Sequence, residues 1–240
     1  MRAAGRLVAE VHLLLAEKLE PGITTEELDA LAEDAIREAG AKPAFKGYRG
    51  YPATICASID EEVVHGIPGA RRLQEGEIIS IDLGVIIKGY YGDAARTLPV
   101  GRVEPEAKRL LQVTERALEV GVKKCREGNR LSDVSHSIQS FVEARGLSVV
   151  RDYVGHGIGQ QMHEAPQIPN FGPPGRGPHL TRGMALALEP MVNIGSYRVK
   201  SKKDGWTVVT SDGSLSAHFE DTVFITDRGP EVLTTLNERQ

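Results

Sequence analysis

Cysteine and long apolar runs are scarce in this chain of 240 residues. Only Cys56 and Cys125 are present, too few for a disulfide framework, and this indicates a reducing compartment. Charged residues from Arg2 to Lys18 interrupt the N-terminal segment, so it holds no apolar stretch that could span a membrane, and no small-residue cleavage site follows it. We therefore expect a cytoplasmic protein that does not enter a membrane.

An excess of positive charge is absent too. The chain has 29 Lys and Arg residues against 33 Asp and Glu residues, which gives a formal net charge of −4. Nucleic-acid-binding proteins usually carry the opposite balance, so we expect no DNA partner, although a local basic patch stays open as an alternative.

Helical periodicity is what the chain does have. Apolar residues recur at helical spacing over 7–19 and stop at Pro21, which predicts a first helix. Thr24 and Glu27 then have the spacing of a capping box. An apolar series follows them up to Gly40, which predicts a second helix.

The same pattern returns in the second half of the chain. Gly22 and Gly40 lie 18 positions apart, as do Gly128 and Gly146. The matching apolar residues between them are Leu28, Ala32, Ala35 and Ile36, and Val134, Ile138, Phe141 and Val142. We infer a duplicated helix pair, and hence a single domain of residues 1–240 built of two pseudo-symmetric halves, about 1–105 and 106–240.

A carboxylate follows a strand-like segment after each helix pair. Asp82 lies six residues after Gly76, and Glu189 lies six residues after Gly183. The equal spacing indicates that these two acids occupy equivalent positions in the two halves.

Each half also supplies a second acid on the returning strand. In IDLGVIIKGYYGDAART, the alternation around Lys-Gly predicts a hairpin in which Asp93 lies roughly opposite Asp82. In SAHFEDTVFIT, the alternation offers Glu220 as the counterpart of Asp93. A pseudo-twofold axis would then bring four carboxylates together.

Four converging carboxylates without counter-charge would be strongly unfavourable. Any one of them could be an exposed strand residue or the partner of an arginine such as Arg96, but the duplicated placement favours divalent cations between them. His65 and His156 lie in two similar HGI motifs, and the glycines beside His156 would allow a close approach, so we take His156 as a ligand. The other histidines are His163 and His218, near the same centre, and His12, His136 and His179, which we assign to packing or the surface.

Five stretches of the chain resemble, in order and with compatible spacing, the successive motifs of the bacterial type I methionine aminopeptidases of peptidase family M24. They are YRGYPATICASIDEEVVHGIP, IDLGVIIKGYYGDAART, YVGHGIGQQMHE, GMALALEPMV and DGWTVVTSDGSLSAHFEDTVFIT. The resemblance covers essentially the whole chain. It implies the α+β pita-bread fold, an antiparallel sheet of pseudo-twofold symmetry with two helix pairs on one face.

The resemblance also implies an activity and roles for individual residues. The expected activity of this monomeric cytoplasmic enzyme is removal of the initiator methionine from nascent polypeptides, with a preference for a small second residue. The positions that match metal ligands are Asp82, Asp93, His156, Glu189 and Glu220, with Asp93 and Glu220 bridging two divalent ions. The positions that match substrate contacts are His65 and His163, and those that match the methionine pocket are Tyr48, Tyr51, Cys56 and Trp206. Simple packing stays the alternative for the three aromatic residues.

The mechanism that this resemblance implies is a hypothesis. A bridging water or hydroxide attacks the scissile carbonyl at the dinuclear site, and Glu189 takes its proton and passes it toward the leaving amine. His163 stabilises the oxyanion, and His65 positions or protonates the leaving nitrogen. The ions are Co, Mn, Fe or Zn. One imidazole and four carboxylates favour Mn, Fe or Co over the chemistry of thiolate zinc sites.

Some features depart from the family pattern or stay open. The chain begins at MRAAGRL, in the middle of the family's usual first element, so a short N-terminal segment is either absent or not included, and the full length of the first helix stays open. Met162 stands where relatives often carry an aromatic residue, and we expect a more adaptable pocket wall. The Pro- and Gly-rich segment 160–180 predicts a loop. The segment KSKKDGW is interpreted as a solvated loop, with a transient contact to ribosomal RNA as the alternative. The rival functions are an X-Pro aminopeptidase or prolidase-like hydrolase, and a non-catalytic binding module on the same fold.

Overall fold

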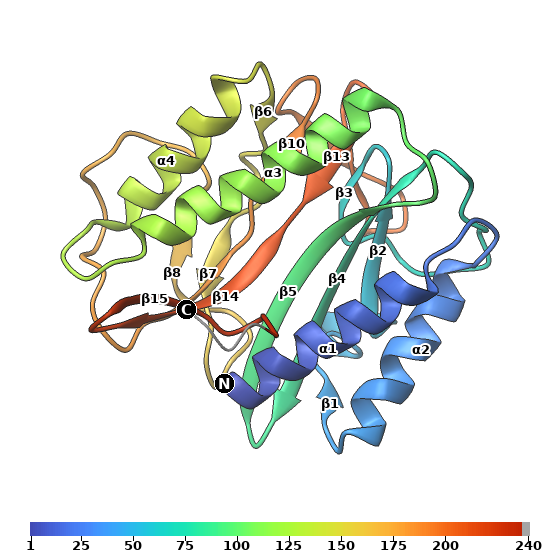
Figure 1. Ribbon diagram of the computed structural model, residues 1–240, viewed down its shortest axis with the longest axis horizontal. Helices are drawn as coiled ribbons and strands as arrows, with labels where there is room; N and C mark the ends of the chain where they lie inside the picture. The colour runs from blue at the N-terminus through green and yellow to red at the C-terminus, as the bar shows by residue number, and fades with distance from the viewer. Residues whose placement is uncertain (237–240) are drawn as a thin grey trace.

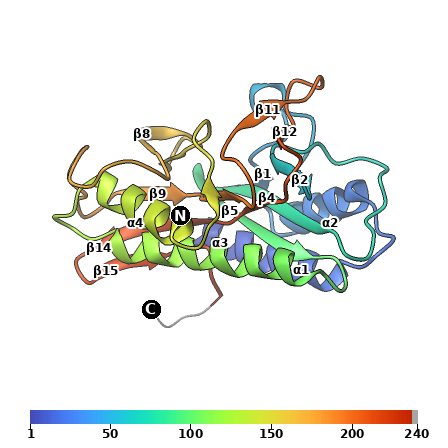
Figure 2. The ribbon, with the colours of Figure 1, turned by 90° about the horizontal axis from the view of Figure 1, so that it is seen from above.

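Two pairs of α-helices lie on one side of the strands in the computed structural model, which describes residues 1–236 (Figures 1 and 2). The pairs are α1 (Arg2–Lys18) with α2 (Thr25–Glu38), and α3 (Pro105–Lys124) with α4 (Leu131–Glu143). A short 3-10 helix, η1 (Tyr48–Gly50), follows the first pair. Among the residues described, no helix is long and apolar enough to cross a membrane.

The strands divide between the two halves of the chain. Those of the first half are β1 (Lys42–Pro43), β2 (Ile55–Ile59), β3 (Glu62–Val64), β4 (Ile78–Ile87) and β5 (Tyr90–Pro99). Those of the second half are β6 (Ser148–Val149), β7 (Gly155–Gly157), β8 (Glu164–Ile168), β9 (Ala185–Leu188), β10 (Met191–Asn193), β11 (Val199–Ser201), β12 (Val208–Thr210), β13 (Ser216–His218), β14 (Glu220–Thr226) and β15 (Gly229–Val232).

The main sheet joins the two halves at its centre. Its nine strands follow the order β1-β4-β5-β14-β9-β7-β8, with β2 paired to β4 and β15 paired to β14. Two three-stranded sheets, β13-β10-β6 and β11-β12-β3, complete the structure. The predicted α+β architecture, with a sheet covered on one face by two helix pairs, is confirmed (Figure 1).

Local sequence explains where the second helix of each pair begins. Thr24 Oγ1 accepts a hydrogen bond from the N–H of Glu27 at 3.2 Å, and the Glu27 carboxylate accepts one from the N–H of Thr24 at 2.7 Å. This is the predicted capping box of α2. In α4 only the second of these bonds has a counterpart, from the N–H of Arg130 to Asp133 Oδ2 at 2.8 Å.

The predicted hairpin is formed by β4 and β5. Residues 88–89 make the turn with φ values of 51° and 80°, the left-handed values of a two-residue hairpin turn. Gly84 pairs with Asp93, and Asp82 pairs with Ala95. The two aspartates are therefore diagonal neighbours on one face rather than directly opposite one another.

The second half contains the same hairpin in interrupted form. Leu188 of β9 pairs with Asp221 of β14, and Met191 of β10 pairs with His218 of β13. The register is unchanged across the break at residues 189–190, so the two short pairings continue one another.

This register corrects the correspondence inferred from sequence. Gly84, the partner of Asp93, lies two residues after the first acid of its half, and Met191, the partner of His218, lies two residues after the first acid of the other half. His218 is thus the counterpart of Asp93, and Glu220 corresponds to an alanine. The sequence pattern did not separate the two possibilities because residues two apart on a strand share a face.

Each half has its own buried apolar cluster between helices and sheet. In the first half Leu28 and Ile36 of α2 pack with the apolar residues of α1, β2, β4 and β5. In the second half Val134 and Ile138 of α4 pack with those of α3, β9 and β14. The four named side chains have no exposed surface, as their matching positions in the sequence predicted.

Two segments differ from their predicted loop structure. The Pro- and Gly-rich segment 160–180 contains β8, which pairs with β7. The segment KSKKDGW begins in β11, which pairs with β12, and Lys202 Nζ binds Glu62 Oε1 at 2.6 Å. Strand pairing therefore gives order to stretches whose composition alone predicts loops.

Candidate metal centre and its pocket

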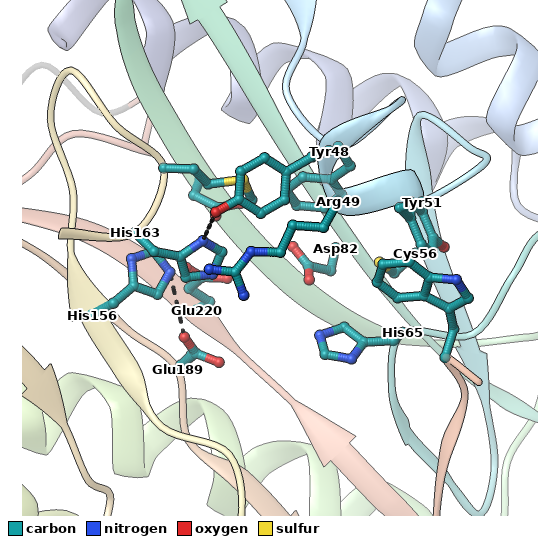
Figure 3. A pocket seen from close by; sticks show the side chains of 14 residues that line it. Tyr48, Arg49, Tyr51, Cys56, His65, Asp82, His156, His163, Glu189 and Glu220 are labelled. Carbon is teal, nitrogen blue, oxygen red and sulfur yellow. Dashed lines mark hydrogen bonds and ion pairs between the residues drawn. The ribbon is translucent and has the colours of Figure 1, made fainter. Parts of the chain in front are cut away.

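One pocket brings together the eleven residues to which the resemblance assigns a metal, substrate or methionine-pocket role (Figure 3). Four are the acids Asp82, Asp93, Glu189 and Glu220, three are the histidines His65, His156 and His163, and four are Tyr48, Tyr51, Cys56 and Trp206. The remaining lining residues are Phe45, Arg49 and Met162. His12, His136 and His179 do not line it. His218, which we expected near the same centre, is not among its lining residues.

The acids and one histidine come from five different elements. Asp93 on β5, His156 on β7 and Glu220 at the start of β14 each offer one ligand atom, and these atoms lie within 4.8 Å of one another. Asp82 on β4 and Glu189, directly after β9, lie beside this group (Figure 3). Both halves of the chain therefore contribute to the group.

Burial raises the pKa of every acid in the group, and repulsion by neighbouring acids raises the pKa of three of them further. Burial raises the pKa of Asp93 to about 8. It also raises the pKa values of Asp82 and Glu189 well above their usual range, and the charge of Asp93 adds to this. The pKa of Glu220 is raised by burial and then by the other three acids. One buried carboxylate oxygen each of Asp82, Asp93 and Glu220 has no hydrogen-bond partner.

His156 presents a lone pair to these acids. Its Nδ1 lies 2.9 Å from the carbonyl oxygen of Gly157, and donation to that oxygen leaves Nε2 unprotonated, 3.6 Å from Glu189 Oε1. Burial lowers the pKa of His156 to about 4, so the ring is neutral at pH 7. A Cβ on Gly155 or Gly157 would lie 2.4 or 2.2 Å from a carbonyl oxygen of β9 or β8. The flanking glycines thus allow β7 to lie this close to its neighbours.

These donors fit a divalent cation. A cation would supply the charge that the unpartnered carboxylate oxygens lack, and it would be met by oxygen ligands and a neutral imidazole. Cys56 does not change this set, because burial raises the pKa of its thiol well above the usual range and keeps it protonated.

His163 and Tyr48 form one wall of the pocket. The Tyr48 hydroxyl lies 2.9 Å from His163 Nδ1, and the two rings stack with centroids 5.4 Å apart. When the hydroxyl donates to Nδ1, the proton of the neutral ring is on Nε2, which is then a hydrogen-bond donor. The His163 and His156 ring centroids are 4.2 Å apart, so this donor lies next to the acids.

His65 lies on another side of the same pocket. Its φ of 62° is in the left-handed region, which is uncommon for a residue other than glycine and is often found at functional sites. Its ring meets that of Tyr153 edge-on, with centroids 5.5 Å apart. Burial, followed by the charge of His163, lowers the pKa of His65 to about 4.

The remaining wall is apolar. Phe45, Tyr51, Cys56 and Met162 belong to one buried cluster, and Trp206 packs against it. The Tyr51 and Trp206 rings meet edge to face with centroids 5.1 Å apart. The Tyr51 hydroxyl lies 3.0 and 2.9 Å from two backbone carbonyl oxygens. These aromatic residues therefore both pack together and line the pocket.

Arg96 does not neutralise the group of acids. Its guanidinium donates to the backbone carbonyl of Glu220 and, at 2.6 Å, to Asp221 Oδ1. The alternative that these acids are simply partners of arginines is therefore not supported for Arg96. Its bonds instead hold the backbone at the start of β14.

Two threonines beside the acids link β5 to the second half: Thr222 joins β14 to β5, and Thr97 joins β5 to β13. Thr222 Oγ1 accepts from the N–H of Asp93 at 3.0 Å and donates to its carbonyl at 2.8 Å. Thr97 Oγ1 makes the same two bonds to His218, both at 2.8 Å. His218 Nε2 is buried without a hydrogen-bond partner, 4.0 Å from Glu189 Oε2.

The sequence did not single out Phe45 or Arg49. Phe45 precedes the YRGYP stretch, and Arg49 lies within it. Nothing in composition or periodicity marks either residue as part of a pocket. The signal for Arg49 was its position between Tyr48 and Tyr51, two residues already assigned to the pocket.

This fold and this acid-lined pocket are those of a metallopeptidase: the model of Metallopeptidase family M24 matches residues 1–227. The chain is 57% identical to a methionine aminopeptidase of Clostridium acetobutylicum, over 98% of this chain and 94% of that one. The crystal structure of methionine aminopeptidase from Rickettsia prowazekii superposes with a TM-score of 0.97 at 45% identity, covering 98% of this chain and 95% of that one. The chain therefore belongs to family M24, and within it to the methionine aminopeptidases.

A more distant neighbour shares the fold alone. The prolidase from Pyrococcus horikoshii has a TM-score of 0.79 at 21% identity, and this chain covers 62% of it. This likeness fits the expectation of a pita-bread fold and gives no support for a prolidase activity.

Proposed function

We propose that the protein removes the N-terminal methionine from newly made polypeptides, with a preference for a small second residue. The 57% identity to a methionine aminopeptidase over 98% of the chain carries this proposal. The pocket supports it, because its lining combines an apolar wall with acids and histidines. We propose a cytoplasmic monomer, since nascent chains are made in the cytoplasm and one chain supplies the whole pocket lining.

Two divalent ions, of Co, Mn, Fe or Zn, complete the proposed site. The residues that would hold them are Asp82, Asp93, His156, Glu189 and Glu220. When bound, such ions lower the pKa of water and polarise a carbonyl oxygen. The unpartnered carboxylate oxygens and the free Nε2 of His156 support this ligand set.

The shape and polarity of the pocket orient the substrate. The methionine side chain packs against the apolar wall that includes Tyr51 and Trp206, where a thioether has favourable contacts with aromatic rings. The free α-amino group then points toward the acids. A formylated N-terminus lacks that amine, and we expect it to be refused.

Glu189 is the proposed proton acceptor. Burial raises its pKa well above the usual value of a glutamate, which makes its carboxylate a stronger base. It takes a proton from the attacking water and passes it to the leaving amine.

The histidines act on the other atoms of the scissile bond. With Tyr48 donating to its Nδ1, His163 directs an Nε2 proton at the oxygen that gains charge during attack. His65, which burial keeps neutral, orients the leaving nitrogen.

A transient contact with the ribosome is also proposed. Lys200 and Lys203 are exposed near Trp206 at the pocket, whereas Lys202 is paired with Glu62. The exposed pair supports attraction to the phosphates of ribosomal RNA. We expect the protein to co-sediment with ribosomes at low salt, and we expect this to fail after Lys200 and Lys203 are both changed to Gln. Equal co-sedimentation of both proteins would contradict it.

Release of free methionine tests the proposed activity. Enzyme stripped with a chelator is given Mn, Co, Fe or Zn in turn, together with Met-Gly-Met-Met or Met-Leu-Met-Met. We expect metal-dependent cleavage of the first peptide only, and loss of cleavage in Glu189→Ala. A folded protein that releases methionine with none of these ions would contradict the proposal.

A further inference from the structure

The pocket has a single fixed cation at its edge. Of the 14 lining residues, Arg49 is the only Lys or Arg, and its side chain is exposed. It forms no ion pair with an acid of residues 1–236. The Arg49 charge is therefore available to a molecule that enters the pocket.

The local structure directs this charge inward. Arg49 has φ 50° and ψ 22° within η1, a conformation in the left-handed region that turns its side chain over the pocket (Figure 3). The guanidinium carbon lies 5.3 Å from the centroid of the Tyr48 ring, within the range of a cation–π contact. Tyr48 is in turn bonded to His163, so Arg49 stands on a wall that is itself held in place.

The direction in which a substrate binds decides what Arg49 meets, and this step rests on the proposed function. The first residue of the substrate occupies the interior, between the apolar wall and the acids. The scissile bond lies beside His163, and the chain that follows must leave through the open side. The exposed guanidinium on this side is thus positioned for the third and fourth residues rather than for the first.

We propose that Arg49 is a specificity residue that favours substrates with an acidic side chain at the third or fourth position. A guanidinium matches a carboxylate with two parallel hydrogen bonds and repels an ammonium group. Without Arg49, the pocket lining would present only carboxylates and neutral groups to an acidic side chain of the substrate. This preference concerns the third and fourth residues of the substrate. It is separate from the proposed preference for a small second residue.

Matched peptides measure this preference directly. They are Met-Ala-Asp-Gly-Gly, Met-Ala-Asn-Gly-Gly and Met-Ala-Lys-Gly-Gly, with a second set that carries the variable residue at position four. All have amidated C-termini, so no terminal carboxylate competes. The readout is the ratio of kcat/KM for the Asp peptide over the Lys peptide within each enzyme. A substitution that changes the activity on all peptides equally leaves this ratio unchanged.

The wild-type enzyme is expected to favour Asp over Lys by roughly tenfold at low salt, the sum of one exposed attraction and one repulsion. Arg49→Gln should bring the ratio to about one, and Arg49→Glu should invert it. Arg49→Lys should keep part of it, since the charge stays and the fork is lost. Arg102→Gln removes the same charge from an exposed loop outside the pocket, and should leave the ratio unchanged.

Salt and the neutral peptide complete the test. Raising ionic strength should shrink the wild-type ratio and leave that of Arg49→Gln unchanged. A wild-type ratio near one, or a ratio that persists in Arg49→Gln and Arg49→Glu, would overturn the inference. Failure to cleave even the Asn peptide would instead count against the proposed aminopeptidase activity, so the two failures are distinct.

Discussion

The two halves of the chain repeat one structure but divide the polar residues unequally between them. In both, a helix pair precedes a strand that brings an acid to the pocket: Asp82 lies within β4, and Glu189 directly follows β9. On the returning strands the halves differ, because Asp93 corresponds to His218 and Glu220 corresponds to Ala95. Each returning strand thus contributes one acid to the pocket lining, at positions two residues apart.

This comparison separates what duplication preserves from what it leaves free. The backbone clasp is preserved, since Thr222 binds the backbone of Asp93 as Thr97 binds that of His218. The side chains presented to the pocket are not preserved. The symmetry therefore fixes where groups can stand near the axis, and the sequence of each half decides which groups do.

The largest expected effect comes from making the second half resemble the first. Glu220→Ala reproduces the alanine of position 95 and removes a proposed ligand. We expect kcat/KM to fall by at least about a hundredfold, and the affinity for Mn measured by calorimetry to fall with it. Glu17→Ala, at an exposed acid of α1, is the control that should change neither. Retention of both properties by Glu220→Ala would show that Glu220 holds no ion.

A second change in the same direction gives the second half the acid that the first half carries at the equivalent position. His218→Asp puts a fifth buried carboxylate next to Glu189, and we expect the metal-free protein to lose about 3 kcal/mol of stability, or roughly 6–12 °C in Tm. His218→Asn has the same size without the charge and should lose less than half as much. Thermal unfolding in chelator at pH 7 measures both. Equal losses would mean that the acids do not repel a charge at this position.

The pH dependence of stability tests the acid of the first half, Asp93, without any mutation. Asp93 has an ordinary pKa of 3.8 that burial raises to about 8, so between these values the folded metal-free protein binds more protons than the unfolded chain. The contribution of Asp93 to the free energy of unfolding should therefore be complete below about pH 4, and it should be lost as the pH rises toward 8. We expect about 2 kcal/mol, or about 5 °C in Tm, to be lost between pH 6 and 8.

Added metal should reverse that loss. A divalent ion at 100 times its dissociation constant stabilises the folded state by about 2.7 kcal/mol, and it binds better once the acids are deprotonated. Tm with saturating Mn should thus rise or stay level from pH 6 to 8. A falling Tm of equal slope with and without Mn would contradict the idea that the acids hold the ion.

The smallest effects come from the matched threonines. Thr97→Val and Thr222→Val each remove a hydroxyl that bonds two backbone groups, and we expect similar losses of about 1–2 kcal/mol in chemical unfolding. Only Thr222→Val should also weaken Mn binding, since Thr222 holds the backbone of the acid and Thr97 that of the histidine. Equal effects on Mn affinity would remove the functional distinction between the two clasps.

The helix pairs were predictable because their signals are local. A helix repeats every 3.6 residues, so the apolar series and the Thr24–Glu27 capping box could be read within single segments. Asp82 and Glu189 could be found because each follows a glycine by the same distance. Their presence in one pocket with Asp93 and Glu220 was the consequence of symmetry, which the repeat made visible in the sequence.

The rest depends on contacts between distant segments. A shift of two residues leaves a strand's faces unchanged, so the pairing of His218 rather than Glu220 at the level of Asp93 was hidden from the pattern. Composition predicted a loop at β8, but pairing with β7 decides its structure. Arg49 belongs to a surface turn, and only the fold brings that turn over the pocket.

The pairing of β5 with β14 also has a consequence for the order in which the site is completed during synthesis. Only two residue pairs join these strands, Glu220 with Ala95 and Asp221 with Ala94, and they lie at the acids themselves. During synthesis, the first half emerges with Asp82 and Asp93 long before Glu220 is made. A chain stopped anywhere before residue 220 would lack a member of the group, so the complete set of candidate ligands exists only after Glu220 has been added.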